Sequence, residues 1–144
     1  MRSIVFSFFL LVGVLAKATE TKVLVRAKAK DAKFIGSSIG GAHVKIINEL
    51  TGELLASGTT TGSTGNTTLI MKTPLERGKP ITDESTAGFL ATLDIDQPTF
   101  VTVEVTAPIN QRQSLSSIQF FGIRVKQLGQ RPPGGVLVDF RDPV

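Results

Sequence analysis

Apolar and polar residues alternate along six stretches of the chain. Every second position in these stretches is Val, Ile, Leu, Ala or Phe; the stretches are 22–30, 42–47, 89–95, 101–106, 121–126 and 136–140. A period of two residues in segments rich in β-branched side chains predicts strands that are buried on one face. Residues 53–58 and 67–71 are shorter candidates, and no window shows a 3.6-residue period. The pattern predicts an all-β fold, a single antiparallel β-sandwich of about seven to eight strands.

Gly, Asn and Pro separate the predicted strands. Residues 48–52 read Asn-Glu-Leu-Thr-Gly, which predicts a hairpin turn in which Gly52 supplies a positive φ. The stretch 72–88 is too long for an ordinary connection and holds two prolines and six charges. We expect a semi-ordered loop across one edge or end of the sandwich, where a partner docks. An inert surface insertion is the alternative, because long loops cost little free energy.

The first eighteen residues have the three parts of a secretory signal peptide. Arg2 precedes an apolar run from Ile4 to Ala16, and small residues stand at both ends of Ala16-Lys17-Ala18. We expect cleavage between Ala18 and Thr19, which leaves residues 19–144 as the β-sandwich domain. A retained anchor or a buried N-terminal helix is the alternative, although the run is short for a bilayer span. The expected location is periplasmic or secreted, with no transmembrane segment in the mature chain.

Composition limits the chemistry of the chain. Its 144 residues fit one domain, and they include no Cys, no Trp, no Tyr and one His. These counts exclude disulfides, thiolate metal sites, cysteine nucleophiles and any site that needs two histidines. Lys and Arg total 16 against 12 Asp and Glu, and removal of Arg2 and Lys17 with the signal peptide leaves 14 against 12. We therefore expect no cofactor and only a small positive charge.

One stretch of sequence carries a family resemblance. It reads Ile35-Gly36-x-x-Ile39-x-Gly41-Ala42-x-Val44-x-Ile46-x-Asn48-x-x-Thr51-Gly52-Glu53, followed by Thr59 to Thr61 and Gly65. This pattern resembles the carboxypeptidase-regulatory-like and Cna-B-like modules, which are transthyretin-like, immunoglobulin-like β-sandwiches. The resemblance covers residues 35–68 well and 89–106 loosely, and it implies a fold more than a function. The chain departs from the family in the long stretch 72–88 and after Pro108.

Four basic residues share one face of the first predicted strand: Lys22, Arg26, Lys28 and Lys30. They are candidates for binding an anionic glycan or lipid. The alternative is that they protect an edge strand from pairing with other chains, which is a common use of Lys. We expect no nucleic-acid partner, because no aromatic side chains accompany the charges and the expected location is periplasmic or secreted.

The remaining candidates for chemistry are sparse. His43 lies between Ala42 and Val44 on the polar face of a strand and lacks the partners that catalysis or a transition metal needs. Asp94 and Asp96 share a strand face, yet glycoside chemistry would also need sugar-stacking aromatics, and Ca²⁺ needs about six oxygen ligands. We expect a solvated strand end there.

The family resemblance raises one covalent possibility. Cna-B-like domains can carry an isopeptide bond made from a buried Lys with the help of a carboxylate. Lys28, Glu104 and Asp139 come from the first, a middle and the last predicted strand, but we expect all three to face solvent, where their pKa values would not favour the reaction.

We therefore expect a non-enzymatic binding or structural module of the cell envelope. Its partner would be an unidentified protein or glycan. An anionic-ligand binder and, less favoured, a hydrolase are the alternatives.

Overall fold

The computed structural model describes residues 20–110, 116–125 and 136–140, and this part of the chain is almost entirely β. Its elements are β1 (Glu20–Ala29), the 3-10 helix η1 (Ser37–Ile39), β2 (His43–Asn48), β3 (Leu54–Thr59), the π-helix η2 (Thr68–Lys72), β4 (Phe89–Asp94), β5 (Thr99–Ala107), β6 (Ser116–Val125) and β7 (Val136–Phe140). The prediction of an all-β fold is confirmed, and the described residues form seven strands.

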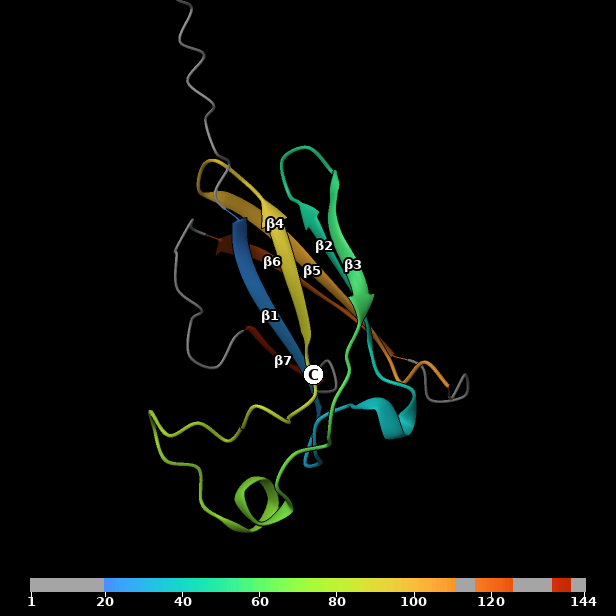
Figure 1. The fold of residues 1–144 in the computed structure, drawn as a ribbon, viewed down its shortest axis with the longest axis vertical. Coiled ribbons are helices and arrows are strands. Elements are labelled where there is room, and N and C mark those ends of the chain that lie inside the picture. Colours follow the sequence, from blue (N-terminus) through green and yellow to red (C-terminus); the bar gives the residue numbers. More distant parts are fainter. Residues whose placement is uncertain (1–19, 111–115, 126–135, 141–144) are drawn as a thin grey trace, which may run out of the picture.

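The seven strands form two sheets (Figure 1). One has three strands in the order β4-β1-β7, and the other has four in the order β3-β2-β5-β6. All pairs are antiparallel except β1 with β7, which is parallel. β1 is the central strand of its sheet, so it is not the edge strand that the Lys-rich pattern suggested.

The hydrophobic core lies between the two sheets. Alternation places one face of each strand inward, since successive side chains of a strand point to opposite faces. β1 and β4 contribute from one sheet and β2 and β5 from the other; the most deeply buried side chains include Val25, Val44, Ile46, Leu93, Val101, Val103 and Val105. On these four strands the inward positions are those that the sequence pattern selected, whereas on β6 Phe121, which the pattern placed inward, is 67% exposed.

The β2–β3 connection is the predicted hairpin turn. The amide of Asn48 donates to the carbonyl of Glu53 (2.8 Å) and that of Gly52 donates to the carbonyl of Asn48 (2.8 Å). Gly52 has φ +73°, a conformation that favours glycine. The Asn48 side chain accepts from the amide of Leu50 (3.0 Å), which fixes the start of the turn.

Residues 67–71 are not the predicted strand, because the chain forms η2 there. Asn66 organises the first turn: its Oδ1 accepts from the amide of Leu69 (3.1 Å) and its carbonyl accepts from that of Ile70 (3.0 Å). The amide of Thr73 then donates to the carbonyl of Thr68 (3.0 Å), the spacing of a π-helix. A run of five residues with one buried side chain, Ile70, is too short for its periodicity to distinguish helix from strand.

Candidate binding site at one end of the sandwich

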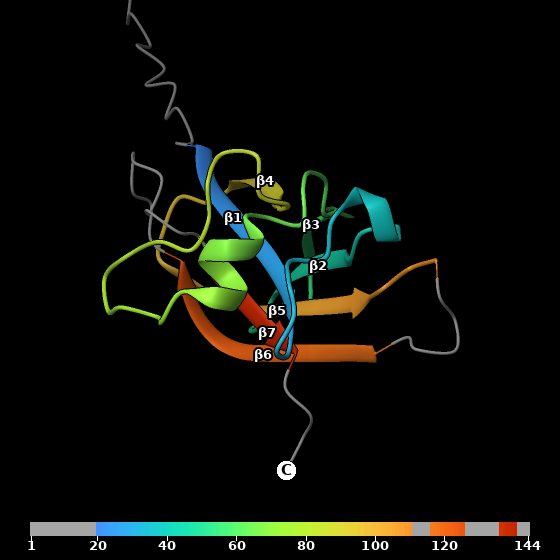
Figure 2. The same ribbon diagram turned by 90° about the horizontal axis from the view of Figure 1, so that it is seen from below.

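Three connecting segments gather at one end of the sandwich, and we call them the loop platform: residues 30–42, 60–72 and 81–88. Figure 2 shows this end, with η2 beside the turn that follows β1. Backbone hydrogen bonds join the segments; they include Phe34 N to Thr64 O (3.2 Å), Ser63 N to Ser85 O (2.8 Å) and Ala87 N to Ser63 O (2.8 Å). Phe34, Ile70 and Ala87 form a second, smaller buried cluster beneath them. The platform is thus a packed extension of the fold.

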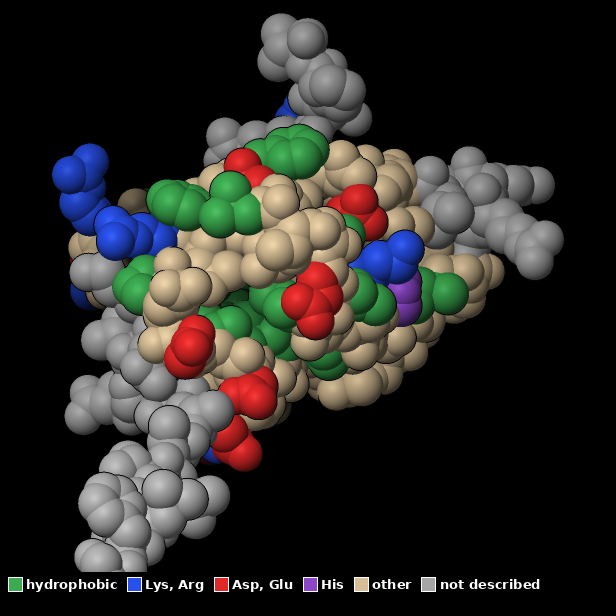
Figure 3. Space-filling model, turned by 90° about the horizontal axis from the view of Figure 1, so that it is seen from above, with side chains coloured by type: hydrophobic (Ala, Val, Ile, Leu, Met, Phe, Trp, Pro, Cys, Tyr) green, Lys and Arg blue, Asp and Glu red, His purple; other side chains and the backbone are tan. Residues whose placement is uncertain are grey.

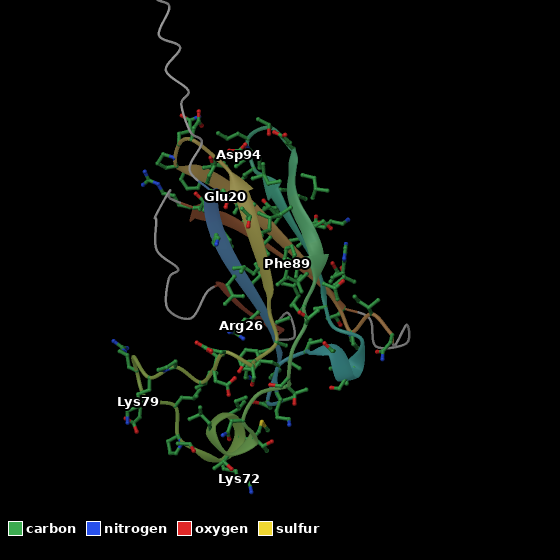
Figure 4. The ribbon with its side chains drawn as sticks, in the orientation of Figure 1. Glu20, Arg26, Lys72, Lys79, Phe89 and Asp94 are labelled. Carbon is green, nitrogen blue, oxygen red and sulfur yellow. The ribbon has the colours of Figure 1, made fainter. Side chains whose placement is uncertain are left out.

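Arg26 fastens one segment of the platform to β1. Its side chain is buried, and its guanidinium donates to the backbone carbonyls of Thr86, Ala87 (3.1 Å) and Asp83 (3.2 Å). Figure 4 shows Arg26 near the end of β1 that adjoins the platform. A buried guanidinium needs such acceptors, because its charge is costly to remove from water. The hydrogen bonds therefore hold the end of the 72–88 stretch against the outer face of β1.

A tight turn at Asp83 shapes the same segment. Its Oδ1 accepts from the hydroxyl of Ser85 and from the amide and hydroxyl of Thr86, each at 2.8 Å. These hydrogen bonds, that of the Ser85 side chain first and that of Thr86 second, hold the pKa of Asp83 below its ordinary value because they stabilise the ionised carboxylate. The charged side chain thus orders the carbonyls that face Arg26.

Thr60 ties the platform to the core of the sandwich. Its hydroxyl is fully buried, donates to the carbonyl of Ile35 (2.8 Å) and accepts from the amide of Ala42 (2.8 Å). Gly41 permits this approach: it has φ +76°, and a Cβ there would lie 2.6 Å from the carbonyl oxygen of Thr60. One hydroxyl therefore satisfies two backbone groups that have left regular structure.

Two segments of the platform, 30–42 and 60–72, line an open pocket of about 450 Å³ together with the end of β1. Its wall includes six apolar side chains, from the end of β1, the turn after it, η1 and η2: Ala29, Ala32, Phe34, Ile35, Ile39 and Met71. Phe34 and Ile35 are buried and make the floor, whereas Ile39 and Met71 are partly exposed at the rim. The volume is within the range of small-molecule sites, which are mostly apolar with a few placed polar groups.

The structure does not bring the four candidate basic residues into one exposed face. Arg26 is buried beneath residues 83–88, and it separates Lys22 from Lys28 and Lys30 along the strand. Lys22 is exposed, Lys28 is half-buried with its Nζ donating to the carbonyl of Ala29 (3.2 Å), and Lys30 lies in the turn beyond β1. The expected cleavage site, Ala18 and Thr19, lies outside the described residues.

The other sequence candidates do not assemble a site. His43 is half-buried on β2, with Nε2 3.5 Å from the hydroxyl of Ser57. Asp94 and Asp96 are exposed where β4 ends, at the end of the molecule opposite the platform. Figure 3 shows this opposite end, which carries scattered acidic side chains. Within the described residues, no three His, Cys, Asp or Glu side chains gather closely enough to hold a metal ion.

The residues considered for an isopeptide bond are divided between the sheets. Lys28 of β1 and Asp139 of β7 are register partners in the three-stranded sheet. Glu104 of β5 belongs to the other sheet, where its carboxylate accepts from the Gln119 side chain and lies 4.0 Å from the Nζ of Lys45. The assisting carboxylate is therefore not beside the other two residues.

Sequence reasoning missed the pocket because its residues come from separated segments. Ile39 lies between Ser38 and Gly40, outside every predicted strand, and Met71 ends the stretch 67–71, which we expected to be a strand. Asn66 before Thr-Thr-Leu-Ile-Met was a usable signal, since Asn is favoured at the start of a helix. No local signal joined that turn to residues 29–39.

Comparison with known protein families, with curated proteins and with solved structures found no match to this chain. None of the helices among the described residues is long and apolar enough to cross a bilayer. The all-β fold therefore rests on the geometry of its strands, and the pocket is the feature from which a function can be argued.

Proposed function

We propose that this protein is an exported, non-enzymatic β-sandwich that acts as a binding module of the cell envelope. The carrying observation is the loop platform: three segments are hydrogen-bonded to one another and to β1, and two of them line an apolar pocket at one end of a rigid scaffold. Binding residues are concentrated on loops that a rigid scaffold positions. Export is supported by the signal-peptide pattern of residues 1–18, with cleavage between Ala18 and Thr19.

Membership of the carboxypeptidase-regulatory-like and Cna-B-like group is part of the same proposal. The motif from Ile35 to Glu53 supports it, as does the arrangement of the described strands in two sheets. Such modules are attached to proteins of many functions. The resemblance therefore supports the scaffold, and the ligand has to be inferred from the residues of the pocket.

A site-specific cross-linking experiment tests the binding role. The full chain, with a photo-cross-linking residue in place of Ile39 on the pocket rim, is expressed in an exporting host and irradiated in the intact envelope. The matched control carries the same residue in place of Leu50, which is 84% exposed in the β2–β3 turn outside the platform. We expect a discrete adduct at position 39 and none at position 50. Equal labelling at both positions, or none at 39, would count against the proposal.

Export is tested separately on the same material. We expect the intact mass of the protein outside the cytoplasm to correspond to a chain that begins at Thr19. A full-length product held in the membrane would refute the signal-peptide assignment and favour a retained anchor.

An anionic partner is the second candidate, and the distribution of lysines supports it. Lys28 and Lys30 lie at the platform end of β1, where Lys33 lines the pocket. Charge reversal at Lys28 and Lys30 should weaken capture of an anionic glycan or lipid, whereas the same change at Lys22 should not, because Lys22 is near the opposite end of the strand.

A further inference from the structure

The pocket has an apolar floor and charged groups only at its rim. Phe34 and Ile35, the buried lining residues, offer no side-chain hydrogen-bonding group, so the part of a ligand that reaches them must be apolar. The polar side chains of the wall, among them Lys33 and Thr67, come from half-buried or exposed positions. A ligand that fits both regions is amphipathic.

The charge near the pocket favours an anionic head group. The segments that form it, residues 28–41 and 60–72, contain four Lys and one Asp, of which Lys33 and the exposed Asp31 line the pocket. The Nζ of Lys33 is placed at the rim by its hydrogen bond to the Thr67 hydroxyl (3.1 Å), which uses one of its three donors. A carboxylate beside this ammonium gains a charge-assisted hydrogen bond, which a cationic head cannot form with Lys33.

The rim is adaptable where it meets solvent. Met71 is 47% exposed and belongs to η2, and Ile39, which is 36% exposed and belongs to η1, also lines the pocket. The unbranched thioether of Met repacks readily around ligands of varied shape, and π-helical turns are frequent at functional sites. Such walls suit a flexible chain better than a rigid ring system.

We propose that this pocket binds the alkyl chain of a single-chain anionic amphiphile, such as a fatty acid, with the carboxylate at Lys33. The inference rests on the proposed function, because it names the ligand class of the same platform. It differs from the basic face expected on the first strand, since the head group meets Lys33 and the chain enters the platform.

Titration of the purified chain with dodecanoate, below the concentration at which it forms micelles, tests the inference. We expect saturable binding by calorimetry, with NMR perturbations concentrated at the methyl groups of Ile39 and Met71. Dodecyltrimethylammonium, which has the same chain and the opposite charge, should bind at least about tenfold more weakly, about 1.4 kcal/mol. Equal binding of both, or none of dodecanoate, would overturn the inference.

Two variants and a matched control separate the head-group and chain contacts. Lys33→Glu should weaken dodecanoate about tenfold, whereas Lys45→Glu, an equal charge change on the outer face of β2, should leave affinity unchanged. Ile39→Asp should abolish binding, and a thermal melt checks that it stays folded. If the Ile39→Asp variant unfolds, the methyl perturbations in the unaltered chain show where dodecanoate binds. Equal losses for Lys33→Glu and Lys45→Glu would refute the head-group assignment.

Two further outcomes distinguish the fatty-acid ligand from a membrane surface and from a protein partner. Binding to phosphatidylglycerol vesicles without binding to monomeric dodecanoate would indicate that the protein binds a membrane surface and not a single amphiphile in the pocket. This result would overturn the inference. A position-39 cross-link to a protein, together with no dodecanoate binding, would keep the proposed binding module and remove only this ligand class.

Discussion

Two buried threonines differ in whether their hydroxyl groups have partners. The Thr60 hydroxyl donates to the carbonyl of Ile35 and accepts from the amide of Ala42, both at 2.8 Å. The Thr21 hydroxyl, on the buried face of β1, has no hydrogen-bond partner within the described part of the chain. The same substitution, Thr→Val, should therefore change stability in opposite directions at the two sites.

The expected magnitudes follow from those contacts. Val replaces Thr with nearly the same shape, so Thr60→Val removes two hydrogen bonds and leaves a buried amide and a buried carbonyl without them. Each such loss costs about 1–3 kcal/mol, so the two together should lower the free energy of unfolding by about 2–6 kcal/mol. Thr21→Val removes a buried hydroxyl that is already unpaired, and it should stabilise the protein by about 1 kcal/mol.

Urea denaturation followed by far-ultraviolet circular dichroism measures both effects, because the chain has no Trp or Tyr for intrinsic fluorescence. With a slope of about 1–3 kcal/mol per molar urea, a loss of about 3 kcal/mol lowers the midpoint by about 1–3 M. The slope should stay the same for both variants. Shifts of the same sign and size at Thr60 and Thr21 would refute the argument from hydroxyl partners.

Four further outcomes follow from the platform and the composition. Arg26→Met should lower the free energy of unfolding by about 2–4 kcal/mol and speed amide exchange of Ala87, because the carbonyls of its segment lose a charged donor; Lys22→Met, at an exposed position, should do neither. Asp83→Asn should destabilise the protein at neutral pH, and the difference in stability from the unaltered chain should shrink as the pH falls below about 4, because the hydrogen bonds that lower the carboxyl pKa stabilise only its ionised form; a pH-independent difference in urea midpoints would contradict this. Replacing residues 73–80, which are all exposed, by a short Gly-Ser linker should leave the melting temperature within a few degrees, and collapse of the fold would place that segment in the core. A chelator should leave the melting temperature unchanged, and a fall of several degrees would reveal an ion site held by oxygen ligands.

The strand pattern was a reliable guide because burial on one face leaves a direct mark on the sequence. Six of the seven described strands include a stretch that alternates, β3 falls on the shorter candidate 53–58, and the turn at Gly52 follows from a residue type that its φ requires. The segment at 67–71 was misjudged because Ile70 packs against Phe34, a contact between distant residues that a five-residue window does not contain.

The candidate site was predicted less well for a related reason. Arg26 occupies the same strand face as Lys22 and Lys28, and no local feature of the sequence distinguishes a solvated cation from one covered by residues 83–88. The stretch 72–88 was expected as one semi-ordered loop, whereas the structure divides it. Residues 73–80 are exposed, and 83–88 are fastened to β1 and to the segment at 61–63.

The sequence by itself determined the all-β class, the positions of β1, β2, β4 and β5, the buried faces of these four strands and the absence of thiol chemistry, since each depends on residue type and short-range periodicity. Only the tertiary structure decided that β1 is central, that Arg26 binds backbone carbonyls and that Phe34, Ile39 and Met71 line one pocket. Those features depend on which segments meet in space. Their geometry is set by the packing of the two sheets and by hydrogen bonds such as those of Thr60, which join residues far apart in the chain.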